Sequence, residues 1–190
     1  RYFPPVELRE EALLSGYVVP GLVATASGTI CTGGRCRRLD GARAYHDHNW
    51  GVWRDVTWEW GAASGPRLAF LYGGVYDSTA RASPFFLALT DSLGVRQVLR
   101  FGHIEYQGRQ RSEGAAGVAA PRAFRMVATR DADTVRLDVT VHHALASAMG
   151  AAGFRRFFLQ MRGRFTLSGT VAGEGVADSG SGFFETYVSR

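Results

Sequence analysis

The sequence predicts an all-β fold, and three observations support this. Apolar and polar residues alternate with a period of two in many short segments, helical periodicity is nearly absent, and Gly-rich turns separate the segments. The 190 residues, 46% apolar and 21% charged, have the size and composition of one globular domain. About a dozen short strands in one domain imply a β-sandwich or a closed β-barrel.

The individual strands follow from the same alternation. Residues 135–141 and 159–167 show it most clearly, with apolar side chains at every second position, as in half-buried antiparallel strands. Further strands are expected at 15–19, 22–31, 35–40, 43–50, 55–61, 67–74, 84–90, 96–106, 122–129, 170–177 and 183–188. Turn residues predict loops at 33–34, 64–66, 131–133 and 179–182. The Ala-rich segment 144–153 is either a short helix or a loop, and 114–120 is expected to be a flexible loop.

The charge pattern argues against a nucleic-acid partner. All 22 basic residues are Arg, the net charge is +5, and the chain has no Lys and one Asn. Because Lys, Asn and Ile use AT-rich codons, their scarcity indicates a GC-rich genome and not a binding function. The Arg residues are interleaved with acids, their densest cluster being Arg35, Arg37 and Arg38, and no nucleic-acid-binding motif is present. No apolar run approaches the roughly 18 residues that a membrane helix needs.

Two cysteines flank a predicted turn. Cys31 and Cys36 enclose Thr-Gly-Gly-Arg, and a four-residue hairpin loop would place them opposite each other within bridging distance. A disulfide would suit an oxidising compartment, hence a periplasmic or membrane-associated protein, whereas two reduced thiols would suit the cytoplasm. The sequence leaves both interpretations open.

All four Trp residues lie between positions 50 and 60, beside a pair of histidines. On a strand, His46, His48 and Trp50 share one face, and on the next strand Trp58 and Trp60 share a face. Three interpretations follow: an aromatic core with structural histidines, a metal site, or a pocket that handles protons beside an apolar ligand. The acids that follow the His pair, Asp55 and Glu59, come too late for the spacing of a cupin-type metal site, so no metal is predicted.

The segments YHDHNWG, WRDVTWEWG and LYGGVYD resemble the hydroxyneurosporene synthase (carotenoid 1,2-hydratase) family and its lipocalin-like, AttH-related relatives. The closing FFLQMRGRFTLSG and GSGFFETYV are similar too, so the resemblance covers 17–188. It implies one lipocalin-like antiparallel barrel over 1–190. Because such proteins commonly hold two barrels in tandem, the chain corresponds to the second, C-terminal barrel. The candidate partners are then another barrel domain, a second copy of the chain, or a membrane surface.

The resemblance also implies an activity, namely acid-assisted hydration or cyclisation of a hydrophobic polyene or terpenoid-like substrate by a cofactor-independent lyase or isomerase. An acid protonates an alkene, aromatic rings stabilise the cation, and water adds. His48 and Trp50 match the His-x-Trp pair of the family, and Asp77 is the counterpart of its acid. The Tyr-x-Asp spacing is not met, because Val75 lies two residues before Asp77. Asp47, Glu59 and Glu105 are substitutes, and Asp77 would otherwise start a turn. Expected substrate-binding residues are His46, Trp53, Trp58, Trp60, Tyr72, Tyr76, Phe101 and His103.

Two further functions compete with catalysis. One is a non-catalytic barrel that binds or carries an apolar ligand, and the other is a structural half-domain that packs against a partner barrel. Three further polar residues have candidate roles. His103 and Glu105 either form a relay or mark the exit of a strand to solvent, and Glu185 is expected to close the barrel with a hydrogen bond. Serine hydrolase, P-loop and Rossmann motifs are absent from the sequence.

Overall fold

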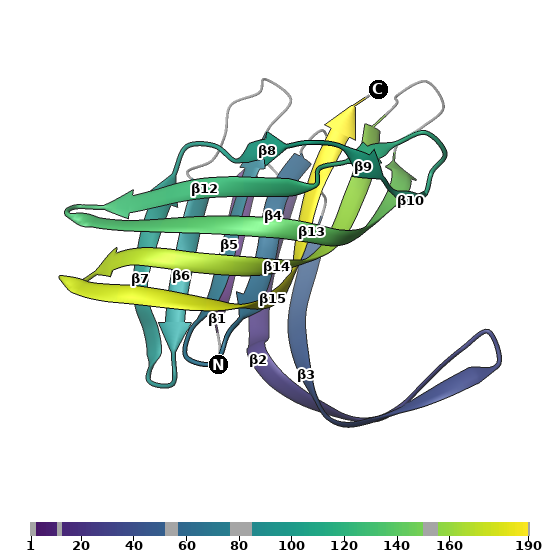
Figure 1. Ribbon diagram of the computed structural model, residues 1–190, viewed down its shortest axis with the longest axis horizontal. Coiled ribbons are helices and arrows are strands. Elements are labelled where there is room, and N and C mark those ends of the chain that lie inside the picture. The colour runs from purple at the N-terminus through teal and green to yellow at the C-terminus, as the bar shows by residue number, and fades with distance from the viewer. Residues whose placement is uncertain (1–2, 11–12, 52–56, 77–84, 150–155, 190) are drawn as a thin grey trace. The chain divides into compact units, whose positions relative to one another are not determined.

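The computed structural model describes residues 3–10, 13–51, 57–76, 85–149 and 156–189, with side chains from residue 16 onward except 76 and 189. These residues form β-strands, turns and connecting segments, as the sequence predicts (Figure 1). Within them, no helix is long and apolar enough to span a membrane. The chain divides into two compact units, Arg1–Arg54 and Asp55–Arg190, which are described separately.

The first unit is a three-stranded antiparallel sheet of β1 (Phe3–Glu10), β2 (Leu13–Thr32) and β3 (Arg35–Gly51). β1 is not predicted from the sequence, and β2 and β3 each replace two shorter predicted strands. Three irregularities in the β2–β3 register, between Val18 and Gly28, let the ladder continue past Pro20. A bulge absorbs an extra residue without ending a strand, which explains the difference.

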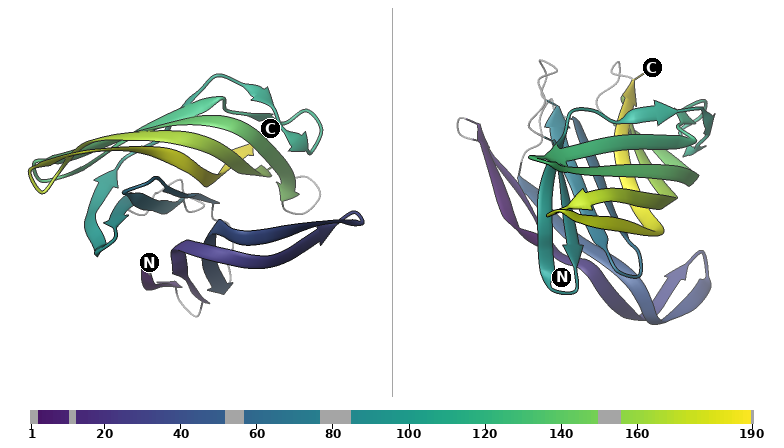
Figure 2. Two further views of the ribbon diagram at one scale, coloured as in Figure 1. Left: turned by 60° about the horizontal axis from the view of Figure 1, so that its bottom comes forward. Right: turned by 60° about the vertical axis from the view of Figure 1, so that its left-hand side comes forward.

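The second unit is a closed antiparallel barrel of eight strands, which confirms the predicted fold class. The strands pair in the order β13-β14-β15-β4-β5-β6-β7-β12, and β12 pairs with β13 to close the ring. Figure 2 shows β12–β15 facing β4–β7 across the interior. The strands are β4 (Thr57–Ser64), β5 (Ala69–Tyr76), β6 (Phe85–Asp91), β7 (Gly94–Phe101), β12 (Ala123–Arg130), β13 (Asp133–Met149), β14 (Arg156–Val171) and β15 (Glu174–Ser189).

Short strands supplement the barrel. β8 (Glu105–Gln107) pairs with β12, β10 (Glu113–Gly114) lies parallel to β13, and β9 (Gln110–Arg111) pairs with β11 (Ala119–Ala120). The segment 114–120, predicted as a flexible loop, is a loop over 115–118, and its ends belong to the short strands β10 and β11. Val118 and Ala120 are buried against the barrel core, and burial of these apolar side chains fixes the segment.

The core lies inside the barrel and contains apolar residues from all eight strands. The predicted alternation is confirmed in β13, where Val135, Leu137, Val139 and Val141 are buried and the residues between them are exposed or half-buried. β13 therefore has an inner apolar face and an outer face that is mostly polar, and the inward-facing residues of the eight strands together form one core.

The prediction of a helix or loop for 144–153 is wrong over 144–149, which continue β13. A register shift lies between Val141 and His143, after which Ala144 and Ala146 pair with β14 and are buried. Alanine favours helices in isolation, but pairing along a long neighbouring strand decides its conformation here. Residues 150–153 lie outside the described residues.

The prediction of a loop at 179–182 is also wrong, because these residues lie within β15 and pair with β14, and Ser181 and Gly182 pair with β4 as well. Glycine permits this close approach. A Cβ at Gly180 would lie 2.2 Å from the Ser64 carbonyl oxygen, and one at Gly182 would lie 2.3 Å from the Ala63 Cβ. The glycines that suggested a turn instead allow two strands to lie close together.

Asp178→Ala is expected to lower the free energy of unfolding by about 2 kcal/mol, because it leaves backbone donors without their acceptor. The Asp178 carboxylate accepts the N–H groups of Arg67 (3.0 Å) and Leu68 (2.7 Å), which ties β15 to the β4–β5 turn. Partial desolvation raises the pKa of this carboxyl, but the backbone N–H donors outweigh it and hold the pKa below its usual range. The contribution should therefore be present at neutral pH and lost in acid, as the pH falls through the lowered pKa.

Urea unfolding of the wild-type protein and of Asp178→Ala, at neutral and at acidic pH, measures this loss of stability. Glu174→Ala is the control, since its exposed carboxylate makes a surface ion pair with Arg96 and should contribute less than about 1 kcal/mol. Equal losses in the two variants would contradict the role assigned to Asp178.

Candidate functional site

The candidate site centres on the carboxyl group of Glu59, a buried charged residue on the inner face of β4. Its side chain is 7% exposed. The Tyr106 hydroxyl donates a hydrogen bond to Oε2 of Glu59 (2.6 Å), and the Thr186 hydroxyl donates one to Oε1 (2.8 Å). The alternation of β4 predicts that Glu59 points away from Trp58 and Trp60, and the fold places the Glu59 side of the strand inside the barrel.

Aromatic rings surround the interior beside Glu59. Tyr72, which is fully buried, stacks on Phe184 with 6.3 Å between ring centroids and meets the edges of Phe101 (6.0 Å) and Phe124 (6.4 Å). Among the described residues, its hydroxyl oxygen is the one buried side-chain polar atom without a hydrogen-bond partner. Leaving a buried hydroxyl without a partner costs about 1–3 kcal/mol, so this group is a candidate for hydrogen bonding to a bound molecule.

Two glycines let these rings lie against the backbone next to Glu59. A Cβ on Gly61, two residues along β4, would lie 2.3 Å from the Tyr72 ring, and one on Gly74 would lie 1.6 Å from the Phe85 ring. Gly74 is directly opposite Glu59 in the β4–β5 register. The glycines therefore allow the Tyr72 and Phe85 rings to lie against the two strands next to Glu59, whose side chain is buried.

This environment changes the acidity of three groups. Burial raises the pKa of the Glu59 carboxyl from 4.5 to about 7, although hydrogen bonds from Tyr106 and Thr186 act in the opposite direction. Burial and the nearby Glu59 charge raise the pKa of both Tyr72 and Tyr106 well above the usual range. Tyr106 is partly exposed, but its hydroxyl contacts the buried acid. Glu59 can therefore act as a proton donor near neutral pH, and both tyrosines stay neutral.

The outer face of β4 carries Trp58 and Trp60. Trp58 packs against Phe158 and Tyr187, with ring centroids 5.6 Å and 4.8 Å away, and its indole N–H donates to Oε2 of Glu185 (3.0 Å). This bond joins β4 to β15 and agrees with the barrel-closing role predicted for Glu185. Trp60 meets the edge of Phe86. Trp58 and Trp60 thus lie on the outer wall of the barrel, on the opposite side of β4 from Glu59.

The histidine pair lies in the first unit, on β3, whereas Trp58 and Trp60 lie on β4 in the second. The expected shared face of His48 and Trp50 is confirmed by their stacked rings, 5.9 Å apart. Tyr45 and Asp47 occupy the other face, where the tyrosine hydroxyl donates to the carboxylate (2.9 Å). His46 pairs with Gly21 and is exposed. Among the described residues, no three His, Cys, Asp or Glu side chains are grouped to hold a metal ion.

The remaining predicted site residues fall in several places. Phe101 is buried in the core and stacks on Phe85 (5.1 Å). His103 and Glu105 are exposed where the chain leaves β7 and enters β8, and Gln107 donates a hydrogen bond to Glu105. Trp53 and Asp77 lie outside the described residues, as does the side chain of Tyr76, whose backbone ends β5.

From the sequence, Glu59 is only a substitute acid, and Tyr106 and Thr186 are not predicted as site residues. The one signal available in the sequence was an acid within an aromatic-rich strand, on the face opposite Trp58 and Trp60. Tyr106 and Thr186 are 47 and 127 residues away from Glu59 in the chain, so no local pattern connects them with it.

The fold and site together define a lipocalin-like antiparallel barrel with a carboxyl group buried among aromatic rings. No family model and no curated protein matches the sequence. Solved structures do match the fold. Kievitone hydratase from Nectria haematococca has a TM-score of 0.59 and 17% identity, and the match covers 93% of this chain and 54% of the hydratase.

Two other solved structures are also similar. An AttH-like protein from Nitrosomonas europaea has a TM-score of 0.59 and 17% identity, with 96% of this chain and 58% of that chain covered. CghA in complex with Sch210972 has a TM-score of 0.55 and 10% identity, and the match covers 93% of this chain and 51% of CghA. The chain thus spans little more than half the length of each of these proteins. They have the barrel fold that the family resemblance implies.

Proposed function

We propose that the barrel binds a hydrophobic polyene or terpenoid-like substrate and that Glu59 protonates it, as the first step of a hydration or cyclisation. One observation carries this proposal: a carboxyl group buried beside an aromatic core, with a pKa raised to about 7. A general acid is most effective when its pKa lies near the working pH. Burial of a carboxyl group among apolar side chains is the usual way to keep it protonated there.

The residues around Glu59 suit each step of such a reaction. The carboxyl proton adds to one carbon of a substrate C=C bond, and the other carbon becomes a cation. The ring faces of Tyr72, Phe124 and Phe184 can stabilise this cation. The Tyr106 and Thr186 hydroxyls hold the carboxylate that remains.

The second step restores the acid. In a hydration, the oxygen of a water molecule bonds to the cation and the surplus proton returns to the Glu59 carboxylate. In a cyclisation, a second C=C bond of the substrate bonds to the cation, and a proton lost from a neighbouring carbon returns to Glu59. Both routes balance without an oxidant or a reductant. The similarity of the fold to that of a hydratase supports the choice of reaction class.

Reaction in D₂O with farnesol or lycopene as the probe tests the proposal. Protonation by a deuterated Glu59 places deuterium on carbon, which mass spectrometry detects in hydrated, cyclised or recovered probe. Glu59→Gln keeps the size of the side chain but cannot donate a carboxyl proton, so we expect at least a hundredfold loss of incorporation, the lower end of general-acid contributions of about 10²–10⁴-fold. Asp47→Asn, Asp77→Asn and Glu105→Gln test the other candidate acids. If one of these abolished incorporation while Glu59→Gln retained it, the assignment of Glu59 would be wrong.

The pH profile provides a second readout of the same site. Because Glu59 must be protonated to act, incorporation should decline as the pH rises through about 7. The Tyr106 hydrogen bond lowers the pKa of Glu59, so Tyr106→Phe should move the decline to higher pH. A purely structural role for Tyr106 would change the rate but not the position of the decline.

The alternative is a barrel that binds or carries an apolar ligand without changing it. The observation that favours it is the buried Tyr72 hydroxyl, which can bond to a ligand whether or not chemistry follows. Farnesol binding, measured by equilibrium dialysis, separates the two functions. Binding by the wild-type protein without deuterium incorporation into any probe would favour the carrier.

A further inference from the structure

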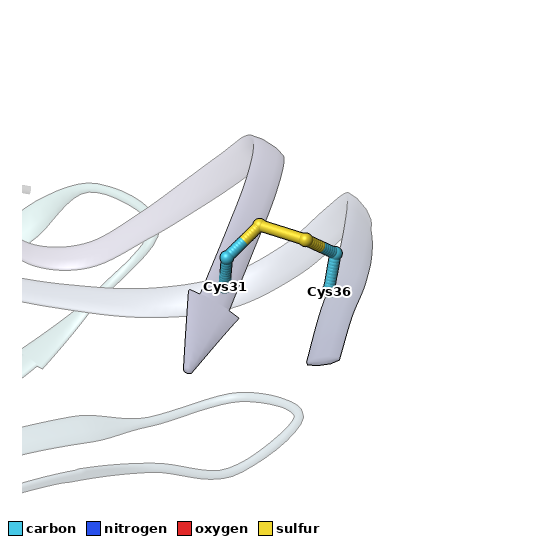
Figure 3. Close-up of a disulfide and its surroundings, with 2 residues drawn as sticks. All are labelled: Cys31 and Cys36. Carbon is cyan, nitrogen blue, oxygen red and sulfur yellow. A yellow bond between two sulfur atoms is a disulfide. The ribbon is translucent and has the colours of Figure 1, made fainter. Parts of the chain in front are cut away.

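The β2–β3 hairpin ends in a rigid tip that the proposed function does not use. β2 and β3 are joined by a two-residue turn, in which Gly33 and Gly34 have φ values of 53° and 75°. Positive φ at both positions is the geometry of a type I′ hairpin turn, which glycine adopts without strain. Just before the turn, Cys31 and Cys36 are directly paired and joined by a disulfide (Figure 3). Of the two states that the sequence left open, a disulfide or two reduced thiols, the structure has the disulfide. It joins the two strands next to the turn.

The two faces of the tip differ in charge. Directly opposed residues of an antiparallel pair point to the same side, so the register assigns each side chain to a face. One face carries the disulfide and Arg38, whose guanidinium is neutralised by Asp40 at 3.1 Å.

The other face, here called the basic face, consists of Ile30, Thr32, Arg35, Arg37 and Leu39. It contains two arginines and no acid. Among the described residues, no ion-pair partner is found for Arg35 or Arg37. Ile30 is 57% exposed, and it lies directly across from Arg37. The basic face therefore offers an exposed apolar side chain directly beside an unpaired positive charge.

We propose that the basic face docks the protein on an anionic lipid surface. Arginine guanidinium groups bind lipid phosphates, and Ile30 can enter the boundary between headgroups and acyl chains. A nucleic acid is a poorer fit, because no aromatic ring lies between residues 18 and 44 to stack on bases. An apolar substrate also concentrates in membranes, so docking there would bring the barrel to its ligand.

Co-sedimentation of the full chain with vesicles measures this interaction. Vesicles of phosphatidylcholine with phosphatidylglycerol should bind the protein, vesicles of phosphatidylcholine alone should bind it weakly, and added salt should release it. Each arginine near the surface contributes about fivefold in affinity, so Arg37→Gln should weaken binding about fivefold and Arg35→Gln/Arg37→Gln about 25-fold. Ile30→Ser should weaken binding as well, without changing its dependence on salt.

The opposite face provides a matched control. Arg38→Gln changes the net charge by the same amount as Arg37→Gln, but on the face where Asp40 already neutralises the arginine, so it should change binding by less than about twofold. Equal effects of the two variants would show a response to net charge alone and would overturn the proposal. Equal binding to neutral and anionic vesicles, or preferential binding to an added oligonucleotide, would overturn it as well. None of these outcomes depends on Glu59, so the proposed reaction is tested separately.

Discussion

Glu59→Gln is expected to remove most of the decrease in stability that the wild-type protein shows between about pH 5 and pH 8. In the folded protein the pKa of Glu59 is about 7, against 4.5 for the exposed group. Between these values the unfolded chain has lost the proton while the folded protein keeps it, so stability falls as the pH rises. A shift of this size corresponds to roughly 3 kcal/mol in the free energy of unfolding. Below about pH 4.5 both states are protonated and the penalty disappears.

Urea unfolding of wild type and variant at about pH 5 and pH 8 measures the difference. The variant should be the more stable protein at high pH, because glutamine is never charged, and the two should converge in acid. Comparing the two proteins cancels the titration of the other acids and histidines. Glu113→Gln, which removes a mostly exposed carboxyl beside His143, should leave the slope unchanged. Parallel slopes for wild type and Glu59→Gln would show that Glu59 is not a buried acid.

Gly74→Ala is expected to destabilise the barrel by about 3 kcal/mol, the upper end of the usual cost of overpacking a core. The added methyl group would lie 1.6 Å from the Phe85 ring, which itself stacks on Phe101 in the core. The ring must therefore move out of its position over the residue opposite Glu59. Since this movement admits water to the carboxyl group, the pKa of Glu59 should fall and the decrease in stability between pH 5 and pH 8 should become smaller.

Gly175→Ala is the matched control for this substitution. Gly175 lies in β15 with nothing within 4 Å of a Cβ, so alanine there should change the stability by no more than about 0.5 kcal/mol. Urea unfolding gives the stability of both variants. A Gly74→Ala protein as stable as Gly175→Ala would contradict the close packing of Phe85 against this strand.

The sequence by itself determined the fold class, most of the strands and the face on which each side chain lies. These properties are local, because successive side chains of a strand point to opposite sides whatever the strand pairs with. The stacking of His48 on Trp50 and the hydrogen bond between Tyr45 and Asp47 follow from this rule. Local composition gave the wrong conformation where strand pairing determined it. The alanines of β13 predicted a helix or loop and the glycines of β15 predicted a loop, but both segments are paired strands.

Only the tertiary structure decided which face of β4 points inward and which acid is buried there. Four carboxyl groups were candidates from the sequence, and their acidities depend on desolvation by strands distant in the chain. Glu59 is distinguished because β15 brings Thr186 to it, Tyr106 reaches it from β8, and two glycines let aromatic rings exclude water around it. Desolvation depends on neighbours in space, and the closed barrel, not the local pattern, sets those neighbours.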